Sequence, residues 1–143
     1  MTIVYVDTSA LVALLVNEAG SASVERWYGR SKDELVSAVW CVTEFASALG
    51  IKQRTRQLDG AQARSAWERF GRLAVSDLRL LPLEATHFHR AATLTLDPRS
   101  SLRAGDALHL ACAEQAGARG IATLDEVQQR TARRLKIKPV VFR

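Results

Sequence analysis

Short apolar runs alternate along the chain with longer segments in which apolar residues recur every three or four positions. The short runs are rich in β-branched and aliphatic residues and predict strands at 3–6, 35–39, 78–83, 120–124 and 139–142. The longer segments have the period of amphipathic helices, at 10–15, 21–30, 41–54, 63–73, 85–96, 102–116 and 127–135. This alternation predicts an α/β fold, a parallel sheet of about five strands flanked by helices on both faces.

The chain has the length of one ordinary domain, 143 residues, of which 48% are hydrophobic and 24% are charged. It has no repeat and no Pro- or Gly-rich linker, so we expect a single domain over residues 1–143. No apolar stretch is long enough to cross a bilayer, and Asp7 interrupts the first apolar run before it could act as a signal peptide. We therefore expect a cytoplasmic protein without a membrane partner.

Two cysteines, Cys41 and Cys112, lie in predicted helices among apolar neighbours. This setting favours buried free thiols in a reducing compartment, although the sequence alone leaves a disulfide open. The spacing of the cysteines to the three histidines matches no zinc pattern.

Four carboxylates occupy positions that one edge of the sheet could bring together. Asp7 and Asp125 each follow a predicted strand, and Glu44 and Asp106 lie in the early turns of apolar helices. The carboxyl edge of a parallel sheet is where open α/β folds bind ligands. Clustered carboxylates repel one another and are costly to bury unless a cation intervenes. The pattern therefore predicts a site for a hard divalent cation and metal-assisted phosphodiester hydrolysis.

A simpler interpretation exists for the acids that follow strands. An aspartate in this position often only caps the next helix, which alone could explain Asp7 or Asp125. Thr8 and Ser9 are further N-cap candidates for the first helix. For each acid taken alone the two interpretations stay open, and the four together favour a site.

The charge balance points to a polyanionic partner once the acids are set aside. The net charge is +5, and without the four acids 20 basic residues face 11 acidic ones. The basic residues form two groups, Lys52, Arg54 and Arg56, and Arg130, Arg133, Arg134, Lys136 and Lys138. The second group follows Asp125 directly, which favours contact with phosphates, although charge runs are often only solvated faces.

Four motifs together resemble a PIN domain. They are Asp-Thr-Ser-Ala-Leu at 7–11, Thr-Glu-Phe-Ala-Ser-Ala-Leu at 43–49, Asp-Ala-Leu-His-Leu-Ala at 106–111 and Ala-Thr-Leu-Asp at 122–125. Within that superfamily, the length and motif order are similar to the toxin ribonucleases of VapBC toxin–antitoxin pairs. The resemblance covers essentially the whole chain.

The resemblance implies a metal-dependent endoribonuclease that acts as a toxin. It implies that Asp7, Glu44 and Asp106 are the core metal-binding acids, with Asp125 as the fourth. The supporting hydroxyls would be Thr8 or Ser9, and Thr123. It also implies Mg²⁺, for which Mn²⁺ may substitute, an RNA substrate, a homodimer and a cognate antitoxin whose tail covers the site. The chain departs from the pattern after Asp125, where residues 126–129 lack the aromatic that many relatives carry.

Three other functions compete with this one. A hydrolase with an aspartyl nucleophile would carry a second acid two residues after Asp7, where this chain has Ser9. A receiver-like domain would need a phosphoacceptor aspartate that we do not find. A non-catalytic PIN-like module that binds RNA or protein would have lost a core acid, and all are present.

Three further residues are expected to have structural roles. His109, three residues after Asp106, is expected to be packed or hydrogen-bonded behind the site. Asp97 is expected to form a surface turn, and Glu18 to be solvated.

Overall fold

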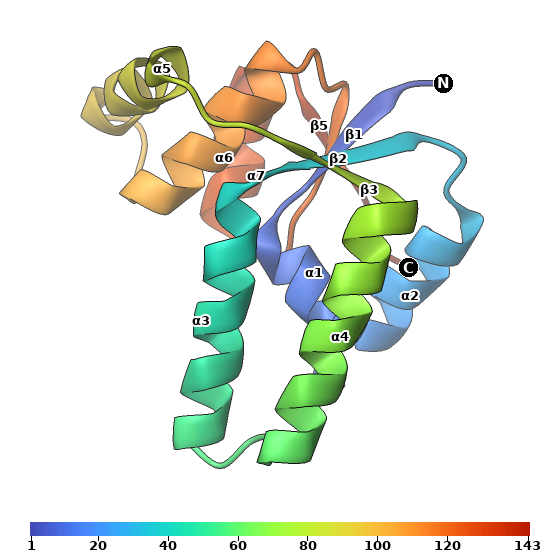
Figure 1. Cartoon of the computed structure of the whole chain (residues 1–143). Coiled ribbons are helices and arrows are strands. Elements are labelled where there is room, and N and C mark those ends of the chain that lie inside the picture. Colours follow the sequence, from blue (N-terminus) through green and yellow to red (C-terminus); the bar gives the residue numbers. More distant parts are fainter.

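In the computed structural model, which describes all 143 residues, five parallel strands form one sheet in the order β3-β2-β1-β4-β5 (Figure 1). The strands are β1 (Ile3–Val6), β2 (Glu34–Ala38), β3 (Leu78–Leu81), β4 (Gly120–Ala122) and β5 (Lys138–Pro139). The helices are α1 (Thr8–Leu15), α2 (Ser21–Arg30), α3 (Trp40–Arg54), α4 (Gly60–Ser76), α5 (Ala85–Leu96), α6 (Ala104–Gln115) and α7 (Glu126–Arg134). The predicted α/β fold with a parallel sheet is confirmed.

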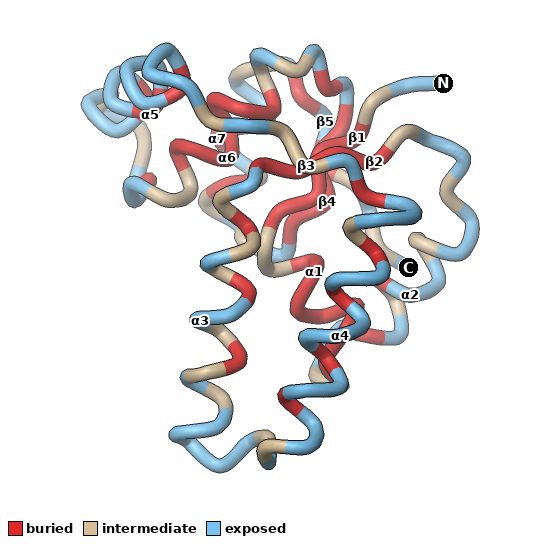
Figure 2. The backbone as a smooth tube through the Cα atoms, in the orientation of Figure 1, coloured by how far each residue is buried: buried red, intermediate tan, exposed pale blue.

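The sheet separates two apolar cores, because alternate residues of a strand point to opposite faces. Val4 and Val6 pack with α1, α2, α3 and α4 in one core, which we call the α1–α4 core. Tyr5, between them, packs with α5, α6 and α7 in the other, the α5–α7 core. Figure 2 shows the buried residues concentrated in the strands and in the helix segments that face them. Each Val or Leu buried here contributes about 1.5–3 kcal/mol to the folded state.

The direction in which the chain crosses the sheet reverses beside β1. From β1 the chain moves outward through β2 to β3 and then returns to place β4 on the other side of β1. Such a switch point opens a crevice at the carboxyl ends of the strands, where open α/β sheets bind ligands. Here the switch point lies between β1 and β4, and Asp7 and Asp125 come after the carboxyl ends of these two strands.

Helices α3 and α4 form a hairpin that extends away from the sheet (Figure 1). Its inner faces meet through stacked aromatic rings of Phe45, Trp67 and Phe70. A capping box formed by Asp59 and Gln62 starts α4. None of the helices combines the length and the apolar character that crossing a membrane requires.

Several local predictions need correction. Asp7, and neither Thr8 nor Ser9, caps α1, because its carboxylate accepts the backbone N–H of Ala10. The strand expected at 120–124 ends at Ala122, where the chain turns toward the start of α7. The strand expected at 139–142 is only Lys138–Pro139, although the N–H of Val140 still donates to the carbonyl of Ile121 in β4.

The two cysteines lie in different cores, Cys41 in the α1–α4 core and Cys112 in the α5–α7 core, and do not pair. Cys41 on α3 and Cys112 on α6 are both free and buried. Burial raises the pKa of each thiol to about 11, so both stay protonated and unreactive. The expectation of buried free thiols is confirmed.

Candidate active site

Asp7 directly follows β1 at the carboxyl edge of the sheet and is only 4% exposed. Its Oδ1 accepts hydrogen bonds from Ser9 Oγ at 2.6 Å and from the N–H of Ala10 at 3.1 Å. Its Oδ2 accepts one from the hydroxyl of Thr123. Burial raises the pKa of Asp7, and His109 together with these donors opposes the rise. The supporting hydroxyls predicted at Ser9 and Thr123 therefore contact Asp7 directly.

Asp125 lies between β4 and the start of α7. Its carboxylate accepts the N–H of Gln128 at 3.1 Å and so caps that helix. Thr123 connects the two aspartates, because its hydroxyl binds Asp7 and accepts the N–H of Asp125 at 3.1 Å. The interpretation that these two aspartates cap the helices after them is confirmed, since both are N-caps. Their capping leaves open whether they also bind a ligand.

Glu44 reaches the same edge from α3. Its Oε1 accepts a hydrogen bond from Thr8 Oγ1 at 2.6 Å and contacts Nε2 of His109. Burial acts to raise the pKa of Glu44, but the hydrogen bonds from His109 and Thr8 lower it overall. The predicted supporting hydroxyl of Thr8 therefore serves Glu44 rather than Asp7.

Asp106 lies in the first turn of α6 and is half-buried. Burial raises its pKa, and the negative charge of Asp125 raises it further, with a smaller contribution from Glu44. These interactions place Asp106 within electrostatic reach of acids from two other elements. The structure thus brings the four predicted acids to one edge of the sheet.

The four carboxylates do not converge on a single point. No group of three or more His, Cys, Asp or Glu side chains is close enough to hold one metal ion. The hydrogen bonds explain this, because Asp7, Glu44 and Asp125 are each engaged by donors of the protein itself. The donor set still has the chemistry of a hard-cation site, namely oxygen ligands whose mutual repulsion a cation would relieve.

Sequence reasoning missed Tyr5, which it treated only as part of a strand. Tyr5 is fully buried, and its hydroxyl lies 2.5 Å from Nδ1 of His109. Gln128 was also missed; its side chain is buried and donates to the backbone carbonyl of Asp106 at 3.2 Å. The only sequence signal for Tyr5 was an aromatic residue in an otherwise aliphatic strand.

The remaining predicted residues lie outside this cluster. Asp97 pairs with Arg99 in an exposed turn, and Glu18 pairs with Lys52. The basic group at 52–56 is at the far end of α3 from Glu44, whereas the group at 130–138 is exposed along α7 and the turn that follows it. The second group begins in α7 soon after Asp125, but it ends at Lys138, which pairs with Gly120 at the start of β4 and so lies at the opposite edge of the sheet from the acids.

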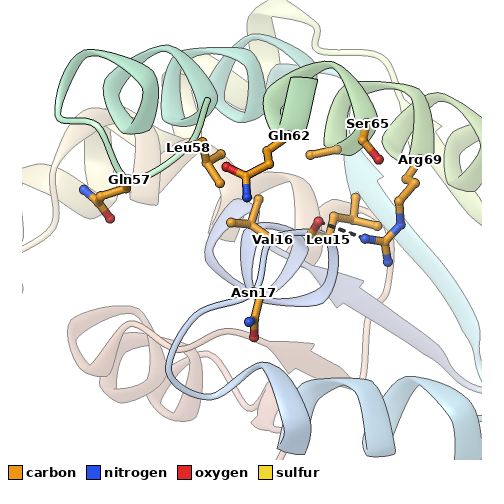
Figure 3. Close-up of a pocket in the computed structure, with 9 residues that line it drawn as sticks. Leu15, Val16, Asn17, Gln57, Leu58, Gln62, Ser65 and Arg69 are labelled. Atoms are coloured by element: carbon orange, nitrogen blue, oxygen red, sulfur yellow. Dashed lines mark hydrogen bonds between the residues drawn. The ribbon is translucent and has the colours of Figure 1, made fainter. Parts of the chain in front are cut away.

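One hollow of the surface lies away from the candidate site. Figure 3 shows it at the C-terminal end of α1, between that helix and α4, where Arg69 donates to the carbonyl of Leu15 at 3.1 Å. The acids lie at the other end of α1, and no carboxylate lines this hollow. The hollow therefore lacks the groups that hydrolytic metal chemistry needs.

Comparison with known proteins agrees with this geometry. The PIN domain family matches residues 4–134 of the chain. No curated protein matches the sequence significantly.

Three solved structures have a similar fold. VapC20 of Mycobacterium tuberculosis, described as a sarcin–ricin loop cleaving toxin, has a TM-score of 0.73 and 15% identity over 90% of this chain and 94% of that chain. FitAcB of Neisseria gonorrhoeae has a TM-score of 0.71 and 16% identity over 96% of each chain. VapBC2 of Rickettsia felis, bound to a DNA fragment from its promoter, has a TM-score of 0.67 and 12% identity over 99% of each. At these identities the likeness is one of fold.

Proposed function

The chain belongs to the PIN domain family, and from this premise we propose that it is a metal-dependent endoribonuclease, the toxin of a toxin–antitoxin pair. The observation that carries the proposal is the gathering of Asp7, Glu44, Asp106 and Asp125 at the β1/β4 switch point. Burial raises the pKa of Asp7, and burial together with the negative charges of Asp125 and Glu44 raises the pKa of Asp106, so negative charge is in excess around Asp106. A divalent cation would neutralise that excess.

The four acids would hold the cation, Mg²⁺ or Mn²⁺. When bound, such an ion activates water and offsets charge on the scissile phosphate. Ser9 and Thr123 keep Asp7 oriented and favour its ionised form, because they donate to it. Thr8 and His109 do the same for Glu44. To hold one ion together, the carboxylates would have to give up some of these hydrogen bonds.

The substrate we propose is RNA. The exposed basic residues at 130–138 follow Asp125 in the sequence, and we expect those in α7 to contact phosphates of the RNA. The net charge of +5 adds a general attraction for a polyanion.

For partners we propose a cognate antitoxin and a second copy of this chain. The support is the likeness in fold to VapBC2 and to FitAB, a structure with a bound DNA fragment. The competing proposal is a PIN-like module that binds RNA or protein without cutting it. One observation favours it: the carboxylates accept hydrogen bonds from the protein and do not converge on one point.

Cleavage of a mixed pool of cellular RNA by the purified protein, free of any partner, tests the proposal. We expect discrete fragments that require Mg²⁺ or Mn²⁺ and that decrease about 100-fold or more in Asp106→Asn. Asp97→Asn, which alters an exposed acid paired with Arg99, is the matched control and should cut normally.

Equal cutting by the wild type and Asp106→Asn would mean contamination by another nuclease. If neither cuts RNA and neither binds metal, the binding module becomes the better function. Mapped fragment ends would identify the RNA and the site that is cut.

A further inference from the structure

His109 is an unusual residue in this fold because both of its ring nitrogens have partners while the ring is only 2% exposed. Nδ1 lies 2.5 Å from the hydroxyl of Tyr5, and Nε2 contacts Oε1 of Glu44. The partners come from β1 and α3, 104 and 65 residues away in sequence. The imidazole therefore connects the centre of the sheet to one of the proposed metal ligands.

The direction of these hydrogen bonds follows from the two groups at the ends of the series, the backbone N–H of Ala38 and the carboxylate of Glu44. The backbone N–H of Ala38 can only donate, and it lies 3.1 Å from the hydroxyl oxygen of Tyr5. Tyr5 accepts that bond, so its own proton is free to be donated to Nδ1 of His109. A neutral imidazole that accepts at Nδ1 carries its proton on Nε2, where it faces the carboxylate of Glu44. Each bond of the chain then has one donor and one acceptor.

The phenol of Tyr5 is a dependable donor in this position. Tyr5 is fully buried, and burial raises its pKa well above the ordinary value, so it keeps its proton. Its ring packs edge-on against the imidazole, with centroids 5.6 Å apart, which limits rotation of both rings. The other tyrosine, Tyr28, bonds to Asp77 at the surface and has no link to the site.

The two oxygens of Glu44 have different surroundings. Oε1 takes the bonds from Thr8 and His109. Oε2 lies against Gly105, where an added Cβ would be 3.2 Å from it and 3.5 Å from the indole nitrogen of Trp40. Gly105 immediately precedes Asp106, so the oxygen with fewer protein donors faces the turn that carries the next acid.

We propose that Tyr5 and His109 are positioning residues, and that the chain Ala38–Tyr5–His109 holds Oε1 of Glu44 so that Oε2 is presented as the metal-binding oxygen. This rests on the proposed function, because it gives Glu44 a metal to bind. This hydrogen-bond chain determines which ring nitrogen of His109 carries the proton, and so whether His109 can donate to Glu44. Without the proton of Tyr5, the imidazole is free to carry its proton on Nδ1 and to turn an unprotonated nitrogen toward the carboxylate, which repels it.

The test is Tyr5→Phe, which keeps the ring and removes only the hydroxyl, with Tyr28→Phe as the matched control for the same chemical change. In ¹⁵N-histidine NMR spectra at mildly alkaline pH, without metal or RNA, we expect the wild type to hold the Nε2–H tautomer of His109 alone. Tyr5→Phe should populate the Nδ1–H tautomer as well. Mn²⁺ affinity, measured by calorimetry, should fall about 10-fold. Tyr28→Phe should change neither quantity.

His109→Gln and His109→Leu provide a second route if Tyr5→Phe does not fold. Glutamine can still donate to Glu44 whereas leucine cannot, so Mn²⁺ affinity should fall less in the glutamine variant. Equal affinities in the two variants would contradict the positioning role.

The NMR and metal measurements separate two kinds of failure. An unchanged tautomer in Tyr5→Phe, or a doubly protonated ring in the wild type, would overturn the hydrogen-bond chain. A changed tautomer with unchanged Mn²⁺ affinity would overturn the positioning of Glu44. If the wild type bound no Mn²⁺, the metal site of the proposed function would be wrong, and so would the role of Glu44 as a ligand. The NMR result would still show whether the hydrogen-bond chain from Tyr5 to His109 exists.

Discussion

The four acids at the carboxyl edge fall into two pairs that the fold uses differently. Asp7 and Asp125 follow strands and cap α1 and α7, so each stabilises a helix whether or not it binds a ligand. Glu44 and Asp106 lie within helices, and neither is the N-cap residue of its helix. A substitution of Asp7 or Asp125 therefore changes helix capping as well as any binding of a metal. A substitution of Glu44 or Asp106 tests the proposed metal binding without removing an N-cap residue.

The largest effect we expect is on metal-dependent stability. It tests whether the two pairs of acids, despite their different positions, bind the same ion. If the two pairs share one ion, Asp7→Asn and Asp106→Asn should each abolish stabilisation by Mn²⁺, about 2.7 kcal/mol at a concentration 100 times the dissociation constant. Thermal melting with Mn²⁺ and with EDTA measures this. Asp97→Asn should keep the full shift. A loss in only one pair would mean that the other does not contact the ion.

A smaller effect should separate the capping role of Asp125 from its proposed role in RNA cleavage. Asp125→Ala removes the acceptor for the N–H of Gln128 and should lower the free energy of unfolding by about 1 kcal/mol. Asp125→Asn keeps an acceptor and should lose little stability, yet lose RNA cleavage. Urea denaturation without metal, beside a cleavage assay, checks both. An alanine variant as stable as the asparagine variant would contradict a capping role.

The smallest effect concerns the pH dependence of the helix pair. Burial and the charges of Asp125 and Glu44 raise the pKa of Asp106 above 3.8, so the folded state binds that proton more tightly than the unfolded chain. This contribution is present at low pH and is lost as the pH rises through the raised pKa. The stability of Asp106→Asn relative to wild type should therefore increase with pH across that window and then level off.

Urea denaturation in EDTA across the acid range measures this difference. Asp97→Asn should show the opposite sign, because Arg99 lowers the pKa of Asp97 and the stability it confers is lost as the pH falls. A stability difference for Asp106→Asn that does not vary with pH would contradict the raised pKa.

Local chemistry in the sequence was enough to predict the elements and the candidate acids. The 3.6-residue period located α2 and α5 at their observed bounds, and the aspartates after β1 and β4 were recognised as helix starts. Each of these features depends on neighbours a few residues away, which the sequence displays directly. The ends of β4 and β5 were misplaced, because strand length depends on pairing with another strand.

Only the tertiary structure decided which of these residues meet. The strand order places β4 beside β1, and this brings Thr123 onto Asp7 from 116 residues away. The same folding sets Tyr5 under His109 and His109 against Glu44. Periodicity predicts that a residue faces a core, but not which residue it meets there. Those contacts depend on long-range packing of the whole sheet and its helices.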